Sequence, residues 1–327
     1  MDRRTFVSST FASLVTNALS ANAQPATKVP RIGVLFPGTQ AIAAKFVEAF
    51  GNGLREHGYV EGRNIVVERR YGDARLDRIV EVAAELVRLQ LQLIVTATNV
   101  AIAAIQQQSP TMAIVMANST DPVGTGFVSS LSRPGGYITG ITSISSELNA
   151  KRLEFLKELI PGLARVAIMW NPDDRGGASD FNETQSAGRA FRLQLQSVEV
   201  SRAEDLERAF AVSTAERADA LIVIPSAFTY TNRDQIASLA LKHRLPSMYG
   251  AKENVAAGGL IAYGPSYAAT WRRSADYVDR ILKGAKPGDL PIEQPRDFEL
   301  AINLTTAKAL GLTILPSLLQ RADDVMS

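Results

Sequence analysis

Three short segments near the start of the chain decide the fold class: RIGVLF (residues 31–36), NIVVERRY (64–71) and LQLIVTA (91–97). Each contains several valine, isoleucine or leucine residues and has the length of a strand. Two helical patterns separate them, at 42–54 and 79–87, where apolar side chains recur on one helical face. Because a helix that connects two parallel strands lies on a face of the sheet, this alternation predicts an α/β fold with a parallel sheet covered on both faces.

The alternation of strand and helix patterns continues almost to the end of the chain, and it forms two successive series. Further strands are expected at 112–117, 137–142, 165–170, 195–200, 220–224, 246–249, 260–263 and 298–303. Helical patterns lie between most of them, so the chain is expected to form two doubly wound, Rossmann-like lobes of similar size.

The late elements indicate how the lobes are connected. The expected division is 31–143 and 255–286 for lobe 1, and 144–254 and 287–327 for lobe 2. The chain would then pass between the lobes several times, which predicts a multi-strand hinge. We expect its pivots at Tyr249–Gly250 and Gly264–Pro265.

Residues 1–23 have the pattern of a removable export signal peptide. Arg3-Arg4 begin it, a weakly apolar stretch follows at 6–19, and Ala21-Asn22-Ala23 is a cleavage site of the A-x-A kind. The apolar stretch is shorter than the roughly 20 residues that span a bilayer. The arginine pair is similar to a twin-arginine signal, with the general secretory route as the alternative. Residues 24–30 are expected to be a linker, and the mature protein is expected in the periplasm.

Composition excludes several classes of function. The 327 residues contain 35 lysines and arginines against 33 acidic residues, so no basic surface for nucleic acid is expected. There is no cysteine and there are only two histidines, which excludes disulfides and thiolate sites and disfavours a metal centre. No Walker loop, G-x-S-x-G or H-E-x-x-H motif occurs, so we expect no cofactor, no catalytic residues and no enzyme activity.

Small polar side chains follow the expected strands, at the edge where open parallel sheets bind ligands. The candidate ligand-binding residues are Thr39, Thr98, Asn99, Ser119 and Asp121 in the first lobe and Asn171, Ser226, Phe228 and Tyr249 in the second. Hydroxyls, amides and helix N-termini would hold a carboxylate, Asp121 would pair with an amine, and the aromatic rings would cover an apolar body. The alternative is that the polar residues only cap helices, and that Asp121 caps the turn at 122–124.

An ordered series of segments carries a family resemblance. They are GYVEGRNIVVERRY (58–71), LDRIVEVAAELVRLQLQLIV (76–95), DPVGTGFVSSLSRPGGYITGIT (121–142), KRLEFLKELIPGLARVAIMWNP (151–172), GGLIAYG (258–264) and LAINLTTAKALGL (300–312). The series resembles the ABC-transporter substrate-binding family that includes tryptophan- and tyrosine-binding proteins. The resemblance implies a type I periplasmic-binding-protein fold, with two lobes, three crossovers and one ligand enclosed by hinge closure.

The expected function follows from the resemblance together with the signal peptide. A monomeric periplasmic receptor would capture a small molecule, with an amino acid or related carboxylate favoured, and deliver it to an inner-membrane ABC permease and its ATPase. Two alternatives stay open: an exported α/β enzyme such as a hydrolase, and a sensory module that presents its ligand-bound form to a membrane kinase.

Overall fold

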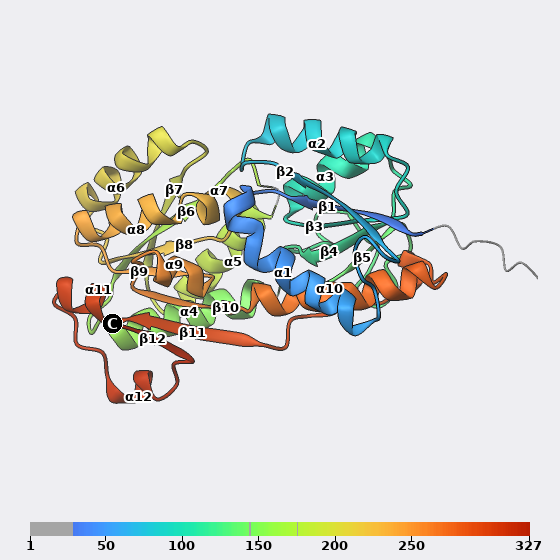
Figure 1. Ribbon diagram of the computed structural model, residues 1–327. Helices are drawn as coiled ribbons and strands as arrows, with labels where there is room; N and C mark the ends of the chain where they lie inside the picture. Colours follow the sequence, from blue (N-terminus) through green and yellow to red (C-terminus); the bar gives the residue numbers. More distant parts are fainter. Residues whose placement is uncertain (1–28, 144, 175) are drawn as a thin grey trace, which may run out of the picture.

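The computed structural model describes residues 29–143, 145–174 and 176–327 and arranges them as two lobes, each built on one β-sheet (Figure 1). The expected signal peptide (1–23) lies outside the described residues, as does most of the expected linker (24–30). Among the helices that are described, none has both the length and the apolar character needed to cross a bilayer.

Lobe 1 is built on a parallel five-stranded sheet with the order β2-β1-β3-β4-β5. Its strands are β1 (Arg31–Phe36), β2 (Val66–Tyr71), β3 (Ile94–Ala97), β4 (Ile114–Asn118) and β5 (Ile138–Gly140). Its helices are α1 (Gln40–Glu56), α2 (Leu76–Arg88), α3 (Asn99–Gln108) and α10 (Tyr267–Leu282), with a short 3₁₀ turn, η2 (Pro287–Asp289).

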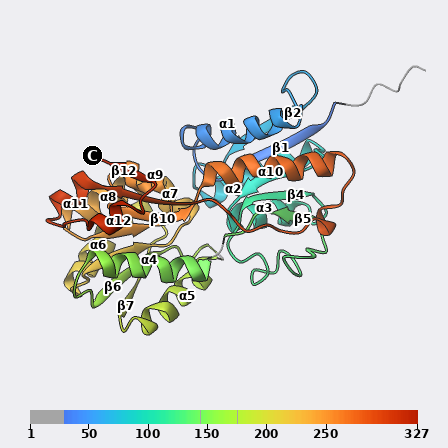
Figure 2. The ribbon, with the colours of Figure 1, turned by 90° about the horizontal axis from the view of Figure 1, so that it is seen from below.

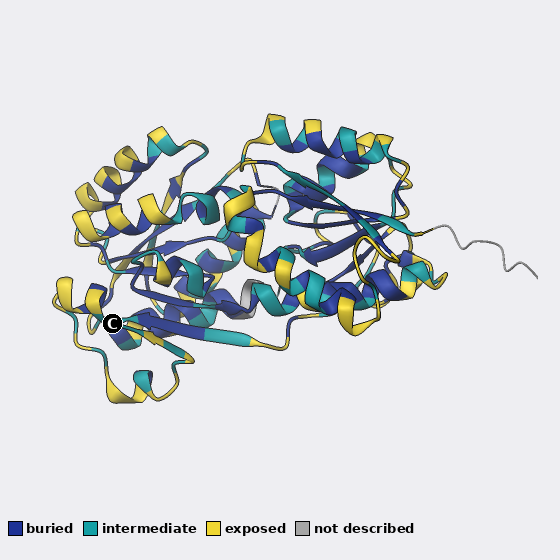
Figure 3. Cartoon of the chain, viewed as in Figure 1, coloured by how far each residue is buried: buried dark blue, intermediate teal, exposed yellow. Residues whose placement is uncertain are grey.

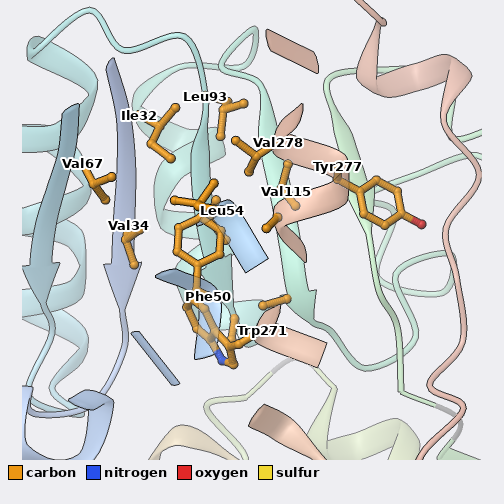
Figure 4. Close-up of a cluster of buried hydrophobic side chains, with 14 of the residues drawn as sticks. Ile32, Val34, Phe50, Leu54, Val67, Leu93, Val115, Trp271, Tyr277 and Val278 are labelled. Atoms are coloured by element: carbon orange, nitrogen blue, oxygen red, sulfur yellow. The ribbon is translucent and has the colours of Figure 1, made fainter. Parts of the chain in front are cut away.

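Helices cover both faces of this sheet, as parallel strands require. Side chains of α2 and α3 pack on one face, and those of α1 and α10 pack on the other. Figure 4 shows Phe50 and Leu54 of α1 and Trp271 of α10 meeting strand residues such as Val34 and Val115. In Figure 3 the inner strands are mostly buried while the outer faces of the helices are exposed. The amphipathic patterns in the sequence therefore determine the two apolar layers.

Lobe 2 is built on a seven-stranded sheet with the order β12-β11-β10-β9-β8-β6-β7. Its strands are β6 (Arg165–Trp170), β7 (Gln194–Glu199), β8 (Ala220–Val223), β9 (Ser247–Tyr249), β10 (Ile261–Pro265), β11 (Phe298–Asn303) and β12 (Asp324–Met326). Its helices are α4 (Ser145–Leu159), α5 (Gly177–Ala190), α6 (Leu206–Ala215), α7 (Ala227–Thr231), α8 (Arg233–Lys242), α9 (Lys252–Ala256), α11 (Leu304–Ala309) and α12 (Pro316–Leu319), with the 3₁₀ turn η1 (Ala203–Asp205). Among the strands that the structure describes, β10 and β11 are the only pair that runs antiparallel.

Over the residues that the structure describes, the chain crosses between the lobes three times, between β5 and α4, between β10 and α10, and between residues 293 and 298 (Figure 2). The expected boundaries are wrong in two segments. Residues 255–265, from the end of α9 through β10, belong to lobe 2, where β10 pairs with β9 on one edge and with β11 on the other. Residues 287–293 stay beside β5 in lobe 1, where the Gly140 carbonyl accepts the Glu293 N–H. Gly264–Pro265 lies at a crossing, whereas Tyr249–Gly250 lies inside lobe 2.

Close contact between α1 and α10 holds the returning helix on lobe 1, and Figures 1 and 2 both show the two helices side by side. Gly53 of α1 lies at their crossing. A Cβ atom added at this position would overlap the Arg272 carbonyl oxygen and would lie 2.8 Å from the Ala275 Cβ. The absence of a side chain at Gly53 therefore allows the helices to approach.

We expect Gly53→Ala to lower the free energy of unfolding by about 1–3 kcal/mol, because overpacking would push α10 away from α1. Gly51→Ala on the same helix is the matched control. An added Cβ there would meet only the end of the Arg55 side chain, so stability should rise by roughly 0.5–1 kcal/mol. Urea unfolding of both variants measures the difference, and equal midpoints would contradict the packing argument.

Candidate functional site

A cavity lies between the lobes, where the carboxyl ends of β1, β3 and β4 face those of β8, β9 and β10. It contains about 1080 Å³ of space between protein atoms, part of it open to solvent. The lining residues follow the strands directly, as expected for an open parallel sheet.

The two lobes touch at the rims of this cavity. On one rim the Lys45 ammonium of α1 lies 2.5 Å from the Glu253 carboxylate of α9. On the other rim, a Cβ atom added to Gly176 would lie 2.7 Å from Asn99 Nδ2 and 2.9 Å from Thr120 Cβ. Because lobe 1 contacts lobe 2 on both sides, the structure has the closed arrangement of the lobes.

A buried hydrogen-bond network fixes the wall that lobe 1 contributes. Asn99 begins α3, and its Oδ1 accepts from the Ser119 hydroxyl at 2.8 Å and from the Thr120 N–H at 3.1 Å. Its Nδ2 donates to the Thr120 carbonyl at 2.8 Å. The loop after β4 is thereby tied to the start of α3, which gives this wall a fixed shape.

Three polar side-chain atoms of the lining are buried without a hydrogen-bond partner in the described part of the chain. They are Thr98 Oγ1, Asn118 Oδ1 and Thr231 Oγ1, from both lobes. Thr98 also has φ +70°, a conformation that is costly for a β-branched residue. Buried polar groups are almost always paired in folded proteins, so unpaired atoms facing a cavity indicate partners from a bound molecule.

Arg152 of α4 gives the cavity a positive charge. The side chain is only 3% exposed, and it donates from Nε to the Tyr263 carbonyl at 2.8 Å and from Nη1 to Asn149 Oδ1 at 2.9 Å. Burial lowers the pKa of the Arg152 guanidinium, because water no longer stabilises its charge.

Two carboxyl groups, Asp174 and Asp180, also line the cavity. Asp174 is 8% exposed, and its Oδ1 accepts from the Gly176 N–H at 3.0 Å. Burial raises the pKa of Asp174 to about 6, and the hydrogen bond from Gly176 opposes this shift only in part. The lining therefore carries charges of both signs.

Aromatic rings form the apolar part of the lining: Phe36, Phe46, Tyr230, Tyr267 and Trp271. Phe46 of α1 lies 6.0 Å from Tyr230 of α7 and 6.4 Å from Tyr267 of α10, measured between ring centroids. Burial raises the pKa of the Tyr267 phenol to about 12. A molecule with an apolar or aromatic body would find a matching surface here.

The structure brings four of the candidate residues into the lining: Thr98, Asn99, Ser119 and Ser226. It places five outside it: Thr39, Asp121, Asn171, Phe228 and Tyr249. Local roles explain these five positions. Thr39 caps α1, Asn171 Oδ1 accepts the Asp173 N–H, and Phe228 and Tyr249 belong to the core of lobe 2.

Asp121 has the capping role that was the alternative to an amine contact. Its Oδ1 accepts the Gly124 N–H at 2.8 Å, which closes the turn after β4. Its Oδ2 lies 3.5 Å from the Ser179 hydroxyl of lobe 2, so the residue joins the rim of the closed cleft.

Sequence reasoning missed Arg152, Asp180, Tyr230 and Trp271 as lining residues. A signal existed for Arg152, since it occupies the apolar face of its helix between Leu148 and Leu156, where a charge is unusual. Asp174 lies just before a helix, where an acidic side chain is expected on dipole grounds, and Trp271 and Tyr230 belong to helices whose aromatic residues are expected in a core. Their approach to the cavity depends on how the lobes are placed.

Comparisons with known proteins agree with this architecture. The profile of the ABC transporter substrate binding protein family matches residues 32–326. A tyrosine-binding protein of Clostridioides difficile is 22% identical over 268 residues, which cover 82% of this chain and 77% of that protein.

Solved structures of similar fold include a conserved domain protein of Vibrio cholerae, with 24% identity, TM-score 0.86 and coverage of 91% of this chain and 100% of that one. A Streptococcus ABC domain in complex with L-Trp has 22% identity, TM-score 0.86 and the same coverage. A leucine-binding protein of Thermotoga maritima has 15% identity and TM-score 0.62, over 80% of this chain and 85% of that one. The fold is thus that of type I periplasmic binding proteins. With the family profile spanning nearly the whole described chain, this protein belongs to the ABC transporter substrate-binding protein family, whose members bind solutes and are not enzymes.

Proposed function

We propose that this protein captures an amino acid, or a related carboxylate, between its lobes and delivers it to an ABC permease. The observation that carries the proposal is the composition of the interlobe cavity. It combines a buried guanidinium, two carboxyl groups, unpartnered hydroxyl and amide atoms, and an aromatic wall. A zwitterion with an apolar side chain matches all of these groups.

The relatives support this ligand class. The Clostridioides difficile protein is a tyrosine-binding protein, and the Streptococcus domain was solved with L-Trp. The aromatic rings that line this cavity, among them Tyr230 and Tyr267, suit an aromatic or branched side chain. A sugar would instead need planar polar side chains arranged around its ring.

The proposed mechanism uses the three crossings between the lobes as a hinge. The ligand would bind first to one lobe and then stabilise the closed arrangement, which it can do only by binding that arrangement more tightly than the open one. The Lys45–Glu253 pair and the contact between Gly176 and Thr120 would form on closure. Closure would also remove the ligand's charged groups from water.

We also propose a location and partners for this protein. The N-terminal pattern of residues 1–23 supports export, by a twin-arginine-like signal, to the periplasm. There the protein would act as a monomer beside an inner-membrane permease and its ATPase. Sequencing the N-terminus of the exported protein should find Gln24 or a residue near it, whereas an intact residue 1 in a cytosolic fraction would contradict export.

Calorimetry with a panel of amino acids, aromatic acids and sugars tests the ligand class. Native mass spectrometry of protein purified from its host would reveal a retained small molecule. With a bound amino acid, small-angle scattering should show a smaller radius of gyration than without it. Tight binding of a neutral sugar and of no amino acid would overturn the ligand assignment, and an unchanged radius at saturation would overturn hinge closure.

A further inference from the structure

Arg152 occupies an unusual position for a charged side chain. It lies on the apolar face of α4, beside the strand that leads into the second crossing, and it is 3% exposed. Its guanidinium is close to the backbone of that region, since Nη2 lies 3.0 Å from the position of a Cβ added to Gly250 and 3.2 Å from one added to Gly264. Both glycines thus leave room for the guanidinium at the base of the cleft.

The hydrogen bonds of Arg152 use only some of the N–H donors of its guanidinium. An arginine has five N–H donors, and two of them donate to the Tyr263 carbonyl and to Asn149 Oδ1. Within the described residues the guanidinium forms no ion pair with a carboxylate, and Nη2 forms no hydrogen bond. Asn149 lies between Arg152 and α5, because its Nδ2 donates to the Asp180 carbonyl oxygen at 3.3 Å.

A buried charge of this kind is expensive unless an opposite charge compensates it. The hydrogen bonds of the cation go to neutral acceptors, while the charge of Asp180 in the same lining opposes in part the lowering of the Arg152 pKa by burial. The remaining donors suit the planar oxygens of a carboxylate, which arginine binds in a bidentate manner. An anionic group of a bound molecule would accept from the donors that the described residues leave open.

We infer that Arg152 determines the charge selectivity of the cavity by pairing with the carboxylate of the ligand. The inference deepens the proposed function and rests on it. Because Arg152 also holds the Tyr263 carbonyl of β10, a carboxylate at this point would bind next to the crossing strand. A ligand without an anionic group would leave these donors of the guanidinium without a charged acceptor in the closed cleft.

The test compares carboxylates with their neutral amides. Calorimetry would measure the dissociation constants of L-tryptophan, L-tyrosine and L-leucine, of their carboxamides and of D-glucose, for the wild type and for Arg152→Gln. We expect the wild type to prefer the acids by roughly a hundredfold, and Arg152→Gln to lose that preference through weaker binding of the acids. Arg152→Lys should recover part of it. Arg70→Gln is the control, since Arg70 pairs with Glu85 away from the cavity.

The possible results distinguish a failure of the Arg152 inference from a failure of the proposed function. If the amino acids bind the wild type no more tightly than their amides, or if Arg152→Gln keeps the preference for acids, the role of Arg152 is overturned. The amino-acid assignment would then still stand. Tight binding of D-glucose and of no amino acid would overturn both.

A stability measurement on the ligand-free protein tests the role of Arg152 even if no molecule of the panel binds. In the ligand-free protein, Arg152→Met should change the midpoint of thermal unfolding by only a few degrees, because the removal of a buried charge offsets the loss of the hydrogen bonds to Tyr263 and Asn149. A loss of many degrees would show that Arg152 serves the stability of the fold, and would overturn the inference.

Discussion

Gly176→Val is expected to weaken ligand binding by roughly ten- to a hundredfold while leaving the ligand-free protein almost as stable as the wild type. Gly176 has φ −78° and ψ −21°, which valine can adopt, so the substitution causes little strain within lobe 2. Across the cleft, however, the new side chain would overlap Asn99 and Thr120 of lobe 1. The variant should therefore keep the lobes apart and penalise only the closed arrangement.

Calorimetry with the amino acid that binds the wild type measures the loss of affinity, and small-angle scattering should show a larger radius of gyration at saturation than in the wild type. Gly176→Ala should give an intermediate effect, because its Cβ alone already approaches Asn99 Nδ2 to 2.7 Å. Gly51→Val, at a half-buried position of α1 where an added Cβ meets only the end of the Arg55 side chain, is the control for the substitution itself. Unchanged affinity in Gly176→Val would mean that ligand binding does not require this closed contact.

The second prediction is a pH dependence of stability that comes from Asp174. Burial raises the pKa of this carboxyl to about 6 from an ordinary value of 3.8. The folded protein therefore binds the proton more tightly than the unfolded chain does. The resulting stabilisation is fully present below pH 4 and is lost as the pH rises through 6, by about 3 kcal/mol in total.

Asp174→Asn should remove this contribution, because an amide stays neutral and its oxygen can still accept the Gly176 N–H. Chemical unfolding of wild type and variant between pH 4 and pH 8 would measure it. The difference in unfolding free energy should move in favour of the variant as the pH rises. Asp173→Asn, at the exposed neighbouring carboxylate, is the control. Parallel pH profiles for wild type and Asp174→Asn would contradict the prediction.

The sequence by itself determined the elements of this fold and the edge at which the site lies. The strands at 31–36 and 165–170 form over the predicted residues, because aliphatic runs between amphipathic helices favour a parallel sheet covered on both faces. The strand at 298–303 also forms over the predicted residues, but it pairs antiparallel with β10, which the alternation did not predict. Thr98, Asn99, Ser119 and Ser226 line the cavity because they follow strands, and the ends of parallel strands meet at one edge of the sheet.

The tertiary structure alone decided which of these residues face the cavity and which charges it holds. Phe228 and Tyr249 also follow strands, but their rings pack into lobe 2, since apolar burial there outweighs exposure to the cleft. Arg152 and Trp271 reach the cavity from helices that lie far apart in the chain, and only the crossings after β5 and β10 place α4 and α10 on its two sides. Local periodicity specifies which face of a helix is buried. It does not specify whether that helix also faces the other lobe, because that placement depends on the path of the whole chain.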